Sequence, residues 1–372
     1  MRPEIFPSGS VVLQEKMEDQ YKKELPYFLQ SFSWKEGMTY KYSPDFYPLN
    51  RKQLETLRLS GQAMGEYLSE YVRIDNLLEF RLDFVCDWNG KLFITEAQTD
   101  DRGLPAVATT RNARVRNNPG IFPGVDQAFM NALEQKSGKD NPNLAIIYPD
   151  EERFYYAGFY DFAKLTWERN PKSNILVAPR SAIGNDNGVL DLKVPFTGYK
   201  LQDEPDFIWD FSLSLPDSQK LIQPLVNKQP LLDIWNNQDE KTARLRQIVP
   251  RTLPIRDEEV KKEKNKWILK PLNGRWSKGV VIGRNVSAEE WEKAGQSEEK
   301  IVAQEFIDPR VESFYVRNKK GKYERNNFFA RVEGYYCMDK SGWKLADVLA
   351  TCTPDLPVHG KRDCIMIPGK VI

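Results

Sequence analysis

Histidine is nearly absent from this chain, because its 372 residues include a single one, His359. This scarcity argues against multi-histidine metal centres, and a zinc site would have to join His359 to Cys337, Cys352 and Cys364 without any CxxC pair. Serine hydrolysis would need the same histidine as its base, and the chain has no GxSxG turn. We therefore expect the chemistry to depend on carboxylates, lysines and arginines.

Disulfides, membrane spans and an excess of charge are also missing. Four cysteines at irregular positions are too few for a disulfide framework, and Cys86 is expected in the core. No apolar run approaches a membrane span, and the first twenty residues lack the apolar segment of a signal peptide. The net charge of +1 gives no bias toward nucleic acid or membrane. These features predict a cytoplasmic protein with neither kind of partner, and they carry no signal of oligomeric state.

The order of the elements divides the chain into three parts. Residues 1–120 contain a helix at 51–72, with apolar residues at helical spacing, and then a hairpin at 81–98. Residues 121–235 begin with a helix near 124–135 and continue with strands alternating with an amphipathic helix, which favours a small parallel α/β layer. Within this layer no GxGxxG pattern follows a strand. Its expected strands are 143–149, 175–183 and 206–211, the helix is 153–170, and 190–201 resembles one arm of a hairpin.

Residues 236–372 form the third part. A lysine-rich helix is followed by strands, a glycine-containing loop and another helix, and the chain ends in antiparallel strands with a turn at 340–342. The expected elements are strands 267–271, 280–283 and 301–307 and helix 287–294. The length of the chain and its 40% hydrophobic content suffice for two or three domains of this kind.

The hairpin places acids opposite each other. If Asn89-Gly90 is a two-residue type I′ loop, Asp83 faces Glu96 and Arg81 faces Gln98. Like charges across a ladder destabilise it, so the facing carboxylates indicate a bound cation such as Mg²⁺. The alternative is an ordinary half-exposed hairpin in which Arg81 neutralises the acids. The other face is expected to hold Phe84, Cys86, Phe93, Thr95 and Ala97.

Two further motifs suit a nucleotide. Lys270 ends an apolar strand, and its charge suits phosphate oxygens, over which the loop with Gly274, Ser277 and Gly279 can fold its backbone N–H groups. A surface hairpin with an extended lysine is the alternative. The strand ending in Gln304, Glu305, Phe306 and Ile307 can offer backbone groups to an adenine edge and an acid to a ribose hydroxyl, or it is a plain core strand with a polar exit.

Together these motifs resemble an ATP-grasp ligase in the permuted arrangement of glutathionylspermidine synthase and its relatives. The family has an Arg-x-Asp strand, a short turn and Glu-x-Asn, and this chain reads Arg81-Leu82-Asp83 and Glu96-Ala97-Gln98. The resemblance covers about two thirds of the chain and depends on the order and spacing of its motifs. It implies an α+β fold, ATP-grasp-like, with the small α/β (pre-ATP-grasp) domain between the hairpin and the lysine-bearing part.

The resemblance also implies roles for single residues. Asp83, Glu96 and Gln98 correspond to Mg²⁺ ligands, although Gln98 replaces the family's Asn with a side chain one methylene longer. Arg81 corresponds to a clamp on the γ-phosphate and Lys270 to the second ATP lysine. Gln304 and Glu305 match the family's hinge. The first ATP lysine is Lys241 or Lys228, and the following helix and turn favour Lys241.

The implied activity is an ATP-dependent carboxylate–amine ligase that uses ATP and Mg²⁺. Such enzymes phosphorylate a small-molecule or peptide acid and let an amine attack the acyl phosphate. Asp100 or Asp101 is a hypothetical contact for the amine and Arg102 for a substrate carboxylate, with a capped solvent loop as the alternative. Two other functions stay open: an ATP-binding protein without ligase activity, and a small-molecule kinase.

Overall fold

The chain forms a mixed α and β structure, seen in a computed structural model. No helix among the described residues is long and apolar enough to cross a membrane. The structure describes residues 40–41, 43–71, 77–99, 122–149, 159, 162–163, 165–166, 172–173, 175–179, 183–184, 191–192, 206–210, 221–222, 226–227, 229–237, 239–272, 279–296, 300–318, 320–358 and 364–372.

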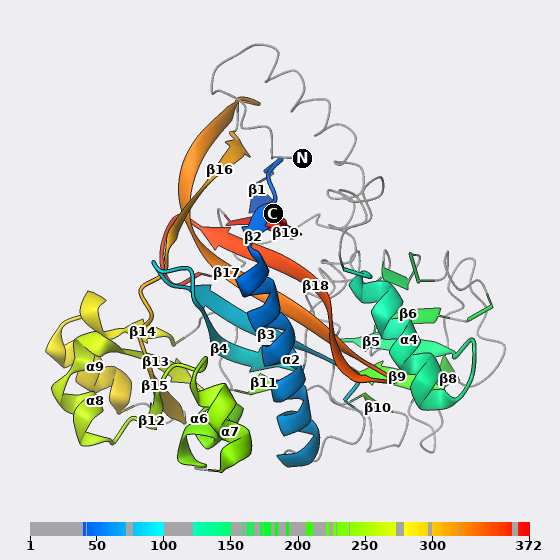
Figure 1. Cartoon of the computed structure of the whole chain (residues 1–372), viewed down its shortest axis with the longest axis horizontal. Coiled ribbons are helices and arrows are strands. Elements are labelled where there is room, and N and C mark those ends of the chain that lie inside the picture. Colours follow the sequence, from blue (N-terminus) through cyan, green and yellow to red (C-terminus); the bar gives the residue numbers. More distant parts are fainter. Residues whose placement is uncertain are drawn as a thin grey trace.

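A large mixed sheet forms the centre of the molecule (Figure 1). Across the described residues it has nine strands, in the order β1-β19-β18-β17-β3-β4-β11, with β16 on β17 and β2 on β19. The pairs of β19 with β1 and β2 are parallel, and the others are antiparallel. Its strands are β1 (Tyr40–Lys41), β2 (Tyr47–Leu49), β3 (Glu79–Cys86), β4 (Leu92–Gln98), β11 (Val226–Asn227), β16 (Val311–Arg317), β17 (Tyr323–Asp339), β18 (Gly342–Thr353) and β19 (Cys364–Val371).

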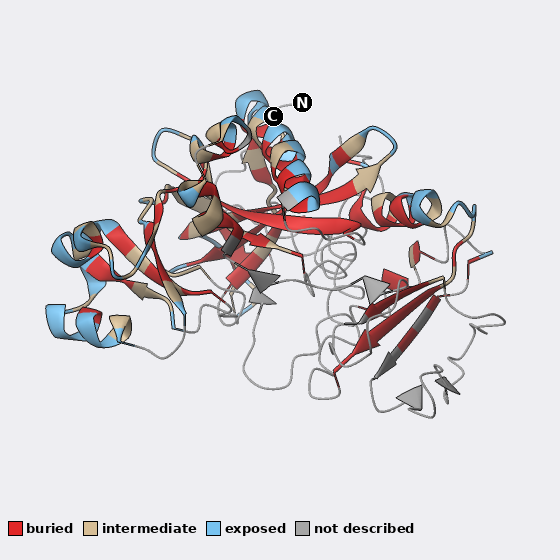
Figure 2. Cartoon of the chain, turned by 90° about the horizontal axis from the view of Figure 1, so that it is seen from below, coloured by how far each residue is buried: buried red, intermediate tan, exposed pale blue. Residues whose placement is uncertain are grey.

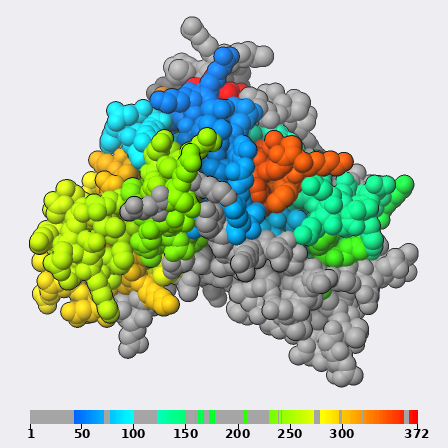
Figure 3. All heavy atoms as spheres, turned by 60° about the horizontal axis from the view of Figure 1, so that its bottom comes forward, coloured from blue at the N-terminus to red at the C-terminus, as the bar shows by residue number. Residues whose placement is uncertain are grey.

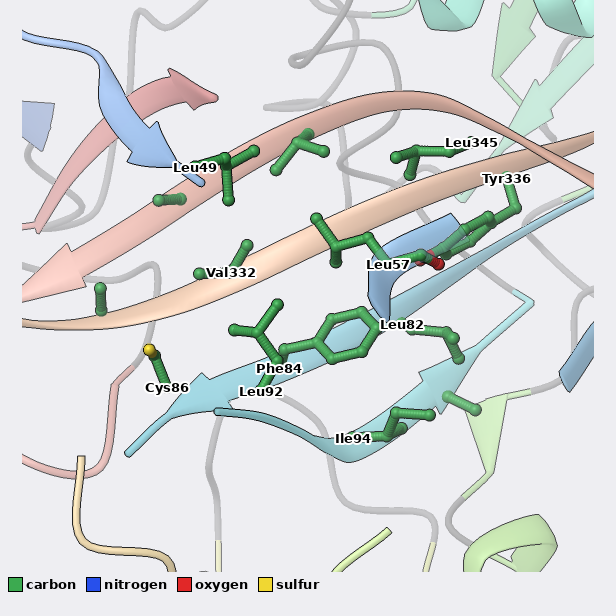
Figure 4. Packing of buried hydrophobic residues seen from close by; sticks show 14 of the residues in the cluster. Leu49, Leu57, Leu82, Phe84, Cys86, Leu92, Ile94, Val332, Tyr336 and Leu345 are labelled. Carbon is green, nitrogen blue, oxygen red and sulfur yellow. The ribbon is translucent and has the colours of Figure 1, made fainter. Parts of the chain in front are cut away.

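Helix α2 (Arg51–Tyr71) covers one face of this sheet. It confirms the helix predicted at 51–72, and the four apolar positions that predicted it are buried: Leu54, Leu57, Met64 and Leu68. Figure 4 shows side chains of β3 and β4, among them Phe84 and Ile94, in one cluster with Val332 and Tyr336 of β17 and Leu57 of α2. This cluster fixes the face of the hairpin that points toward the core.

Two glycines let α2 approach the sheet closely. A Cβ on Gly61 would lie 1.9 Å from the ring of Tyr336, and one on Gly65 would lie 2.2 Å from the ring of Trp343. The ring of Phe80 stacks on Tyr336 at 5.0 Å between centroids and meets the edge of Trp343 at 4.8 Å. The helix therefore rests directly on an aromatic layer, and no side chain larger than hydrogen fits between them.

We expect the substitution Gly61→Ala to destabilise the protein by about 1–3 kcal/mol, since the added methyl forces the buried Tyr336 ring or the helix to move. Urea denaturation followed by far-UV circular dichroism measures this change. Gln62→Ala, at an exposed position of the same helix, is the control and should stay within about 0.5 kcal/mol of the unmodified protein. Equal stabilities for the two variants would contradict the close packing of α2.

Helix α4 (Val125–Ser137) and a parallel sheet lie against one end of the opposite face of the large sheet (Figure 2). They confirm the helix predicted near 124–135, the strands predicted at 143–149, 175–183 and 206–211, and their parallel arrangement. The described residues of the predicted helix at 153–170 are helical. The sheet has the order β10-β9-β5-β6 with β5 (Leu144–Tyr148), β6 (Ile175–Pro179), β9 (Phe207–Asp210) and β10 (Leu221–Ile222), and a separate ribbon pairs β7 (Ile183–Gly184) with β8 (Asp191–Leu192).

A small antiparallel sheet carries Lys270 and forms a lobe at the other end (Figure 3). A capping box at Ser287 starts α9, in agreement with the predicted helix at 287–294. This module, with the helices that precede it, consists of α6 (Gln229–Asn236), α7 (Glu240–Arg246), β12 (Thr252–Pro254), α8 (Glu258–Lys262), η3 (Lys264–Lys266), β13 (Trp267–Pro271), β14 (Val281–Ile282), η4 (Gly283–Asn285), α9 (Ala288–Gly295) and β15 (Ile301–Glu305). We call it the lysine module below.

The sheets group the chain differently from the three predicted segments. The hairpin of segment 1–120 and the C-terminal strands of segment 236–372 belong to one sheet, because β17 pairs with β3. The turn predicted at 340–342 joins β17 to β18, with Gly342 at φ 108°. The lysine module is thus inserted between strands β11 and β16 of the central sheet. The parallel layer is inserted earlier, between β4 and β11.

Candidate functional site

The β3–β4 hairpin pairs Asp83 with Glu96 and Arg81 with Gln98, as predicted. The predicted two-residue turn is wrong. Asp87 N–H donates to Lys91 O, so the loop has three residues, and Gly90 takes a positive φ of 80°. Thr95 is a β-bulge, because it has no partner between the pairs Asp83–Glu96 and Phe84–Ile94. Beyond it the strands regain the predicted register. The bulge offsets the longer turn, which is why the outer pairs are as expected.

The same bulge changes which side chains face the core. Phe93 and Thr95 were expected there, but the core positions of β4 are occupied by Leu92, Ile94 and Ala97, whose side chains are buried. Phe93 instead lies under the Lys91 ammonium, 4.5 Å from its ring centroid. A one-residue shift in register moves every side chain of the shifted stretch to the other face.

Strand β17 completes a row of three acids. Glu333 lies opposite Asp83 on the side of β3 away from β4, so Glu96, Asp83 and Glu333 stand at matching positions on three adjacent strands. Arg81 precedes Asp83 on the same face, and Arg331 precedes Glu333. Helix α2 packs on the opposite face of the sheet.

Ion pairs connect the members of this row. Arg81 Nε lies 2.7 Å from Asp83 Oδ1, and Arg331 Nε lies 3.4 Å from Asp83 Oδ2. Glu333 accepts hydrogen bonds from Arg331 Nη2 at 2.6 Å, from the Tyr335 hydroxyl at 2.7 Å and from the Thr351 hydroxyl at 2.7 Å. Glu333 is therefore fully engaged by protein donors.

The two neighbouring acids differ in their pKa. Burial raises the pKa of Asp83 to about 6, although Arg331 and Arg81 oppose this. Burial also acts on Glu333, but Arg331, Arg81 and the hydroxyls of Tyr335 and Thr351 lower its pKa to about 2. Both carboxyls are inaccessible to solvent, with residue exposures of 0% and 1%. The negative charge of Asp83 is thus the less compensated of the two.

Lys270 reaches this hairpin from the lysine module. Its ammonium donates to Thr95 O at 3.0 Å and to Gln304 Oε1 at 2.8 Å. Thr95 is the extra residue of the bulge and precedes Glu96, and a bulge leaves backbone groups outside the regular ladder. The bulge therefore presents a carbonyl to Lys270 directly beside the row of acids.

Hydrogen bonds on both sides of the small sheet also hold the lysine module to the hairpin. Ile94 N–H donates to Ile248 O at 2.8 Å, shortly before β12 begins. After β15, Arg310 N–H donates to Cys86 O at 2.8 Å, and Asp87 forms a bridge with Pro309. The segments directly before and after the small sheet are thus bonded to β3 and β4, two of the strands that carry the acids.

The predicted hinge residues lie at the end of β15. Gln304 is buried with 2% exposure and faces Lys270, whereas Glu305 is exposed. The N–H groups of Glu305 and Phe306 donate to Arg251 O and Lys266 O at 2.7 Å, so neither is open to an adenine edge. The expectation that backbone groups of residues 304–307 are offered to a base therefore does not extend to these two N–H groups. The guanidinium carbon of Arg284 lies over the Phe306 ring, 4.1 Å from the ring centroid.

The other predicted residues are placed as follows. Gln98 is half-buried and pairs with Val226 of β11 as well as with Arg81. Gly279 is exposed, with φ 75°. Ile307 is half-buried after β15. Lys241 lies in the first turn of α7, and its side chain is outside the description. The remaining expected residues lie outside the described part of the chain: Asp100, Asp101, Arg102, Lys228, Gly274, Ser277 and His359.

Asp83, Glu96 and Gln98 carry oxygen donors of the kind that Mg²⁺ prefers. Among the described residues no group of three or more His, Cys, Asp or Glu side chains lies close enough to hold a metal. The candidate set is smaller: Asp83, Glu96 and the amide of Gln98. Asp83 Oδ1 is buried and accepts no aligned hydrogen bond from the described residues. Mg²⁺ commonly takes one or two carboxylates and keeps water and phosphate oxygens as further ligands.

Sequence reasoning missed Arg331 and Glu333. A signal was present, since Arg331-Val332-Glu333 repeats the spacing of Arg81-Leu82-Asp83 within an alternating strand. The local sequence of either strand does not show that the two strands are neighbours in the sheet. Their pairing brings two arginines and two acids into one cluster, in which Arg331 is half-buried and the other three residues are buried.

Comparison of the sequence with models of known protein families gives no match, and a search of the curated proteins also gives none.

Proposed function

We propose that this protein is an ATP-grasp-like enzyme that binds ATP between the acid row and the lysine module and joins a carboxylate to an amine. The observation that carries the proposal is the contact of Lys270 with Thr95 O, which sets an ammonium beside Glu96 and Asp83. The acids and the lysine are distant in the sequence, and this hydrogen bond joins the two strands that carry them.

The charges suit a triphosphate. Lys270, Arg81 and Arg331 supply positive charge, and phosphoryl transfer needs positioning and charge neutralisation more than a protein base. Asp83, Glu96 and Gln98 would hold Mg²⁺, which bridges phosphate oxygens and neutralises the charge that develops on them. Glu333 keeps Arg331 in place through two hydrogen bonds from the guanidinium.

Apolar side chains accompany Lys270 on one face of the sheet of the lysine module, and two of them, Ile282 and Val302, are buried. Ile268, Ile282 and Val302 lie on the same face of its sheet as Lys270, as the register shows. The opposite face packs against α8 and α9 through Trp267 and Leu269. A nucleotide lying on the first face would have apolar side chains beside adenine and a cationic end for phosphates. Glu305 lies opposite Trp267, so its side chain belongs to the other face and not to a ribose site on this one.

The first test is magnesium-dependent nucleotide binding. Isothermal titration of AMP-PNP should show tighter binding with Mg²⁺ than with EDTA. In Asp83→Asn the Mg²⁺-dependent gain should fall by about 10-fold or more, because one carboxylate ligand is replaced by a neutral amide. Glu324→Gln, at an exposed position of β17, is the control and should keep the full gain. Equal affinities with and without Mg²⁺ in the unmodified protein would remove the metal site from the proposal.

The second test separates a ligase from other uses of ATP. ADP and phosphate release should require both an acid and an amine, supplied from a panel of amino acids, peptides and polyamines. Release with the acid alone, accompanied by a stable phosphorylated product, would identify a kinase. Binding of AMP-PNP without any turnover across the panel would identify a nucleotide-binding protein.

A further inference from the structure

A directed chain of hydrogen bonds inside the lysine module ends on Lys270. Lys270 Nζ donates to Gln304 Oε1 at 2.8 Å, and Gln304 Nε2 donates to Thr252 Oγ1 at 3.3 Å. The Thr252 hydroxyl donates to Pro250 O at 2.9 Å. Thr252 has 0% exposure, so water does not replace these partners.

Each link of this chain has one possible direction. An ammonium has donors only, so Gln304 must turn its carbonyl oxygen toward Lys270 and its NH₂ group toward Thr252. A hydroxyl has a single proton, and Thr252 gives this proton to Pro250 O. Its oxygen is then left as an acceptor for Gln304. The carbonyl of Pro250 therefore sets the orientation of an amide two links away.

The sheet register puts the three side chains on one face. Thr252 lies opposite Gln304 across β12 and β15, and Gln304 lies opposite Ile268 across β15 and β13. Lys270, two residues beyond Ile268, shares that face. The hydroxyl therefore belongs to the same surface as Lys270 and not to the apolar core under α8 and α9.

We propose that Thr252 is a positioning residue, which locks the Gln304 amide and so holds the Lys270 ammonium beside Thr95 O and the acid row. This inference rests on the proposed function, because it assigns Lys270 to phosphate. Without the hydroxyl, the buried NH₂ of Gln304 has lost its acceptor, and the amide can rotate and present a donor to the ammonium. Lys270 then loses the Gln304 carbonyl as an acceptor.

The test compares Thr252→Val, which removes the hydroxyl at nearly constant volume, with Thr252→Ser, which keeps it. The control is Thr353→Val, a buried threonine of β18 whose hydroxyl donates to Asp355 O at 2.6 Å, in the other sheet. Two quantities are measured: the dissociation constant of AMP-PNP with Mg²⁺, and the rate at which acetic anhydride labels Lys270, read by mass spectrometry. The second quantity needs no nucleotide.

For Thr252→Val we expect about 10-fold weaker nucleotide binding, the effect of one charge-assisted hydrogen bond, and faster labelling of Lys270. Thr252→Ser and Thr353→Val should stay within about twofold of the unmodified protein in both quantities. If Thr252→Val does not fold, Thr252→Ala removes the same hydroxyl and carries the same expectations.

Labelling of Lys270 that is unchanged in the hydroxyl-free variant would overturn the inference, whether or not binding falls. An equal loss in Thr252→Val and Thr353→Val would overturn it as well, because it would show general destabilisation. Altered labelling in a protein that binds no AMP-PNP at all would uphold the hydrogen-bond chain and refute the proposed function.

Discussion

Replacing Lys270 by alanine is expected to lower ATP turnover by about 10²–10³ while the fold remains intact. The loss of one preorganised charge contact to a transferring phosphoryl group commonly costs about 3–4 kcal/mol of activation barrier. The side chain is half-buried, and its bonds to Thr95 O and Gln304 connect the module to the hairpin without filling the core. The measurement is kcat/KM for ADP release, with circular dichroism as the check on folding.

The matched control is Lys266→Ala in the same module. Lys266 is exposed and pairs with Glu263 at 2.8 Å. Its removal lowers the charge of the module by the same amount, but at a place away from the acid row. Turnover should therefore change by less than about twofold. A Lys270→Ala enzyme with turnover equal to that of Lys266→Ala would show that phosphate binds elsewhere.

The hairpin shows how far local sequence reasoning reaches. Alternation and an Asn-Gly turn predicted the pairs Asp83–Glu96 and Arg81–Gln98, and both pairs are present. The turn between them has one residue more than predicted, and the bulge at Thr95 takes up the difference. A bulge carries no strong sequence signal, since it is settled by packing on both faces. It was nevertheless the feature that turned a carbonyl toward Lys270.

Long-range pairing accounts for what the sequence could not supply. Arg331 and Glu333 reach the site because β17 adds to β3, and periodicity within a strand does not name its neighbour. The same limit applies to Gln304. The sequence suggested a role for its backbone before a hinge, but it did not show that strand alternation and the neighbouring β12 direct its side chain to Lys270 and Thr252. Helix α2 and the parallel layer could be predicted without knowledge of strand pairing, because their apolar patterns are strong and lie within single segments of the sequence.

Glu333→Gln is expected to have the largest effect on stability, about 3 kcal/mol. Removing one partner of a buried charge pair leaves the other uncompensated. Among the described residues, Arg331 would keep the ion pair with Asp83, at 3.4 Å between Nε and Oδ2. The value is set at the low end of the usual range because the Arg331 side chain keeps 21% exposure and solvent screens part of the change.

Urea denaturation measures this stability, and Glu258→Gln is its control. Glu258 is fully exposed and pairs with Lys261 at 2.7 Å across one helical turn, so no measurable change is expected there. A Glu333→Gln protein as stable as the control would mean that Arg331 finds another anion or turns to solvent. In that case Glu333 would not fix the guanidinium, and Arg331 could not be counted among the preorganised charges around a triphosphate.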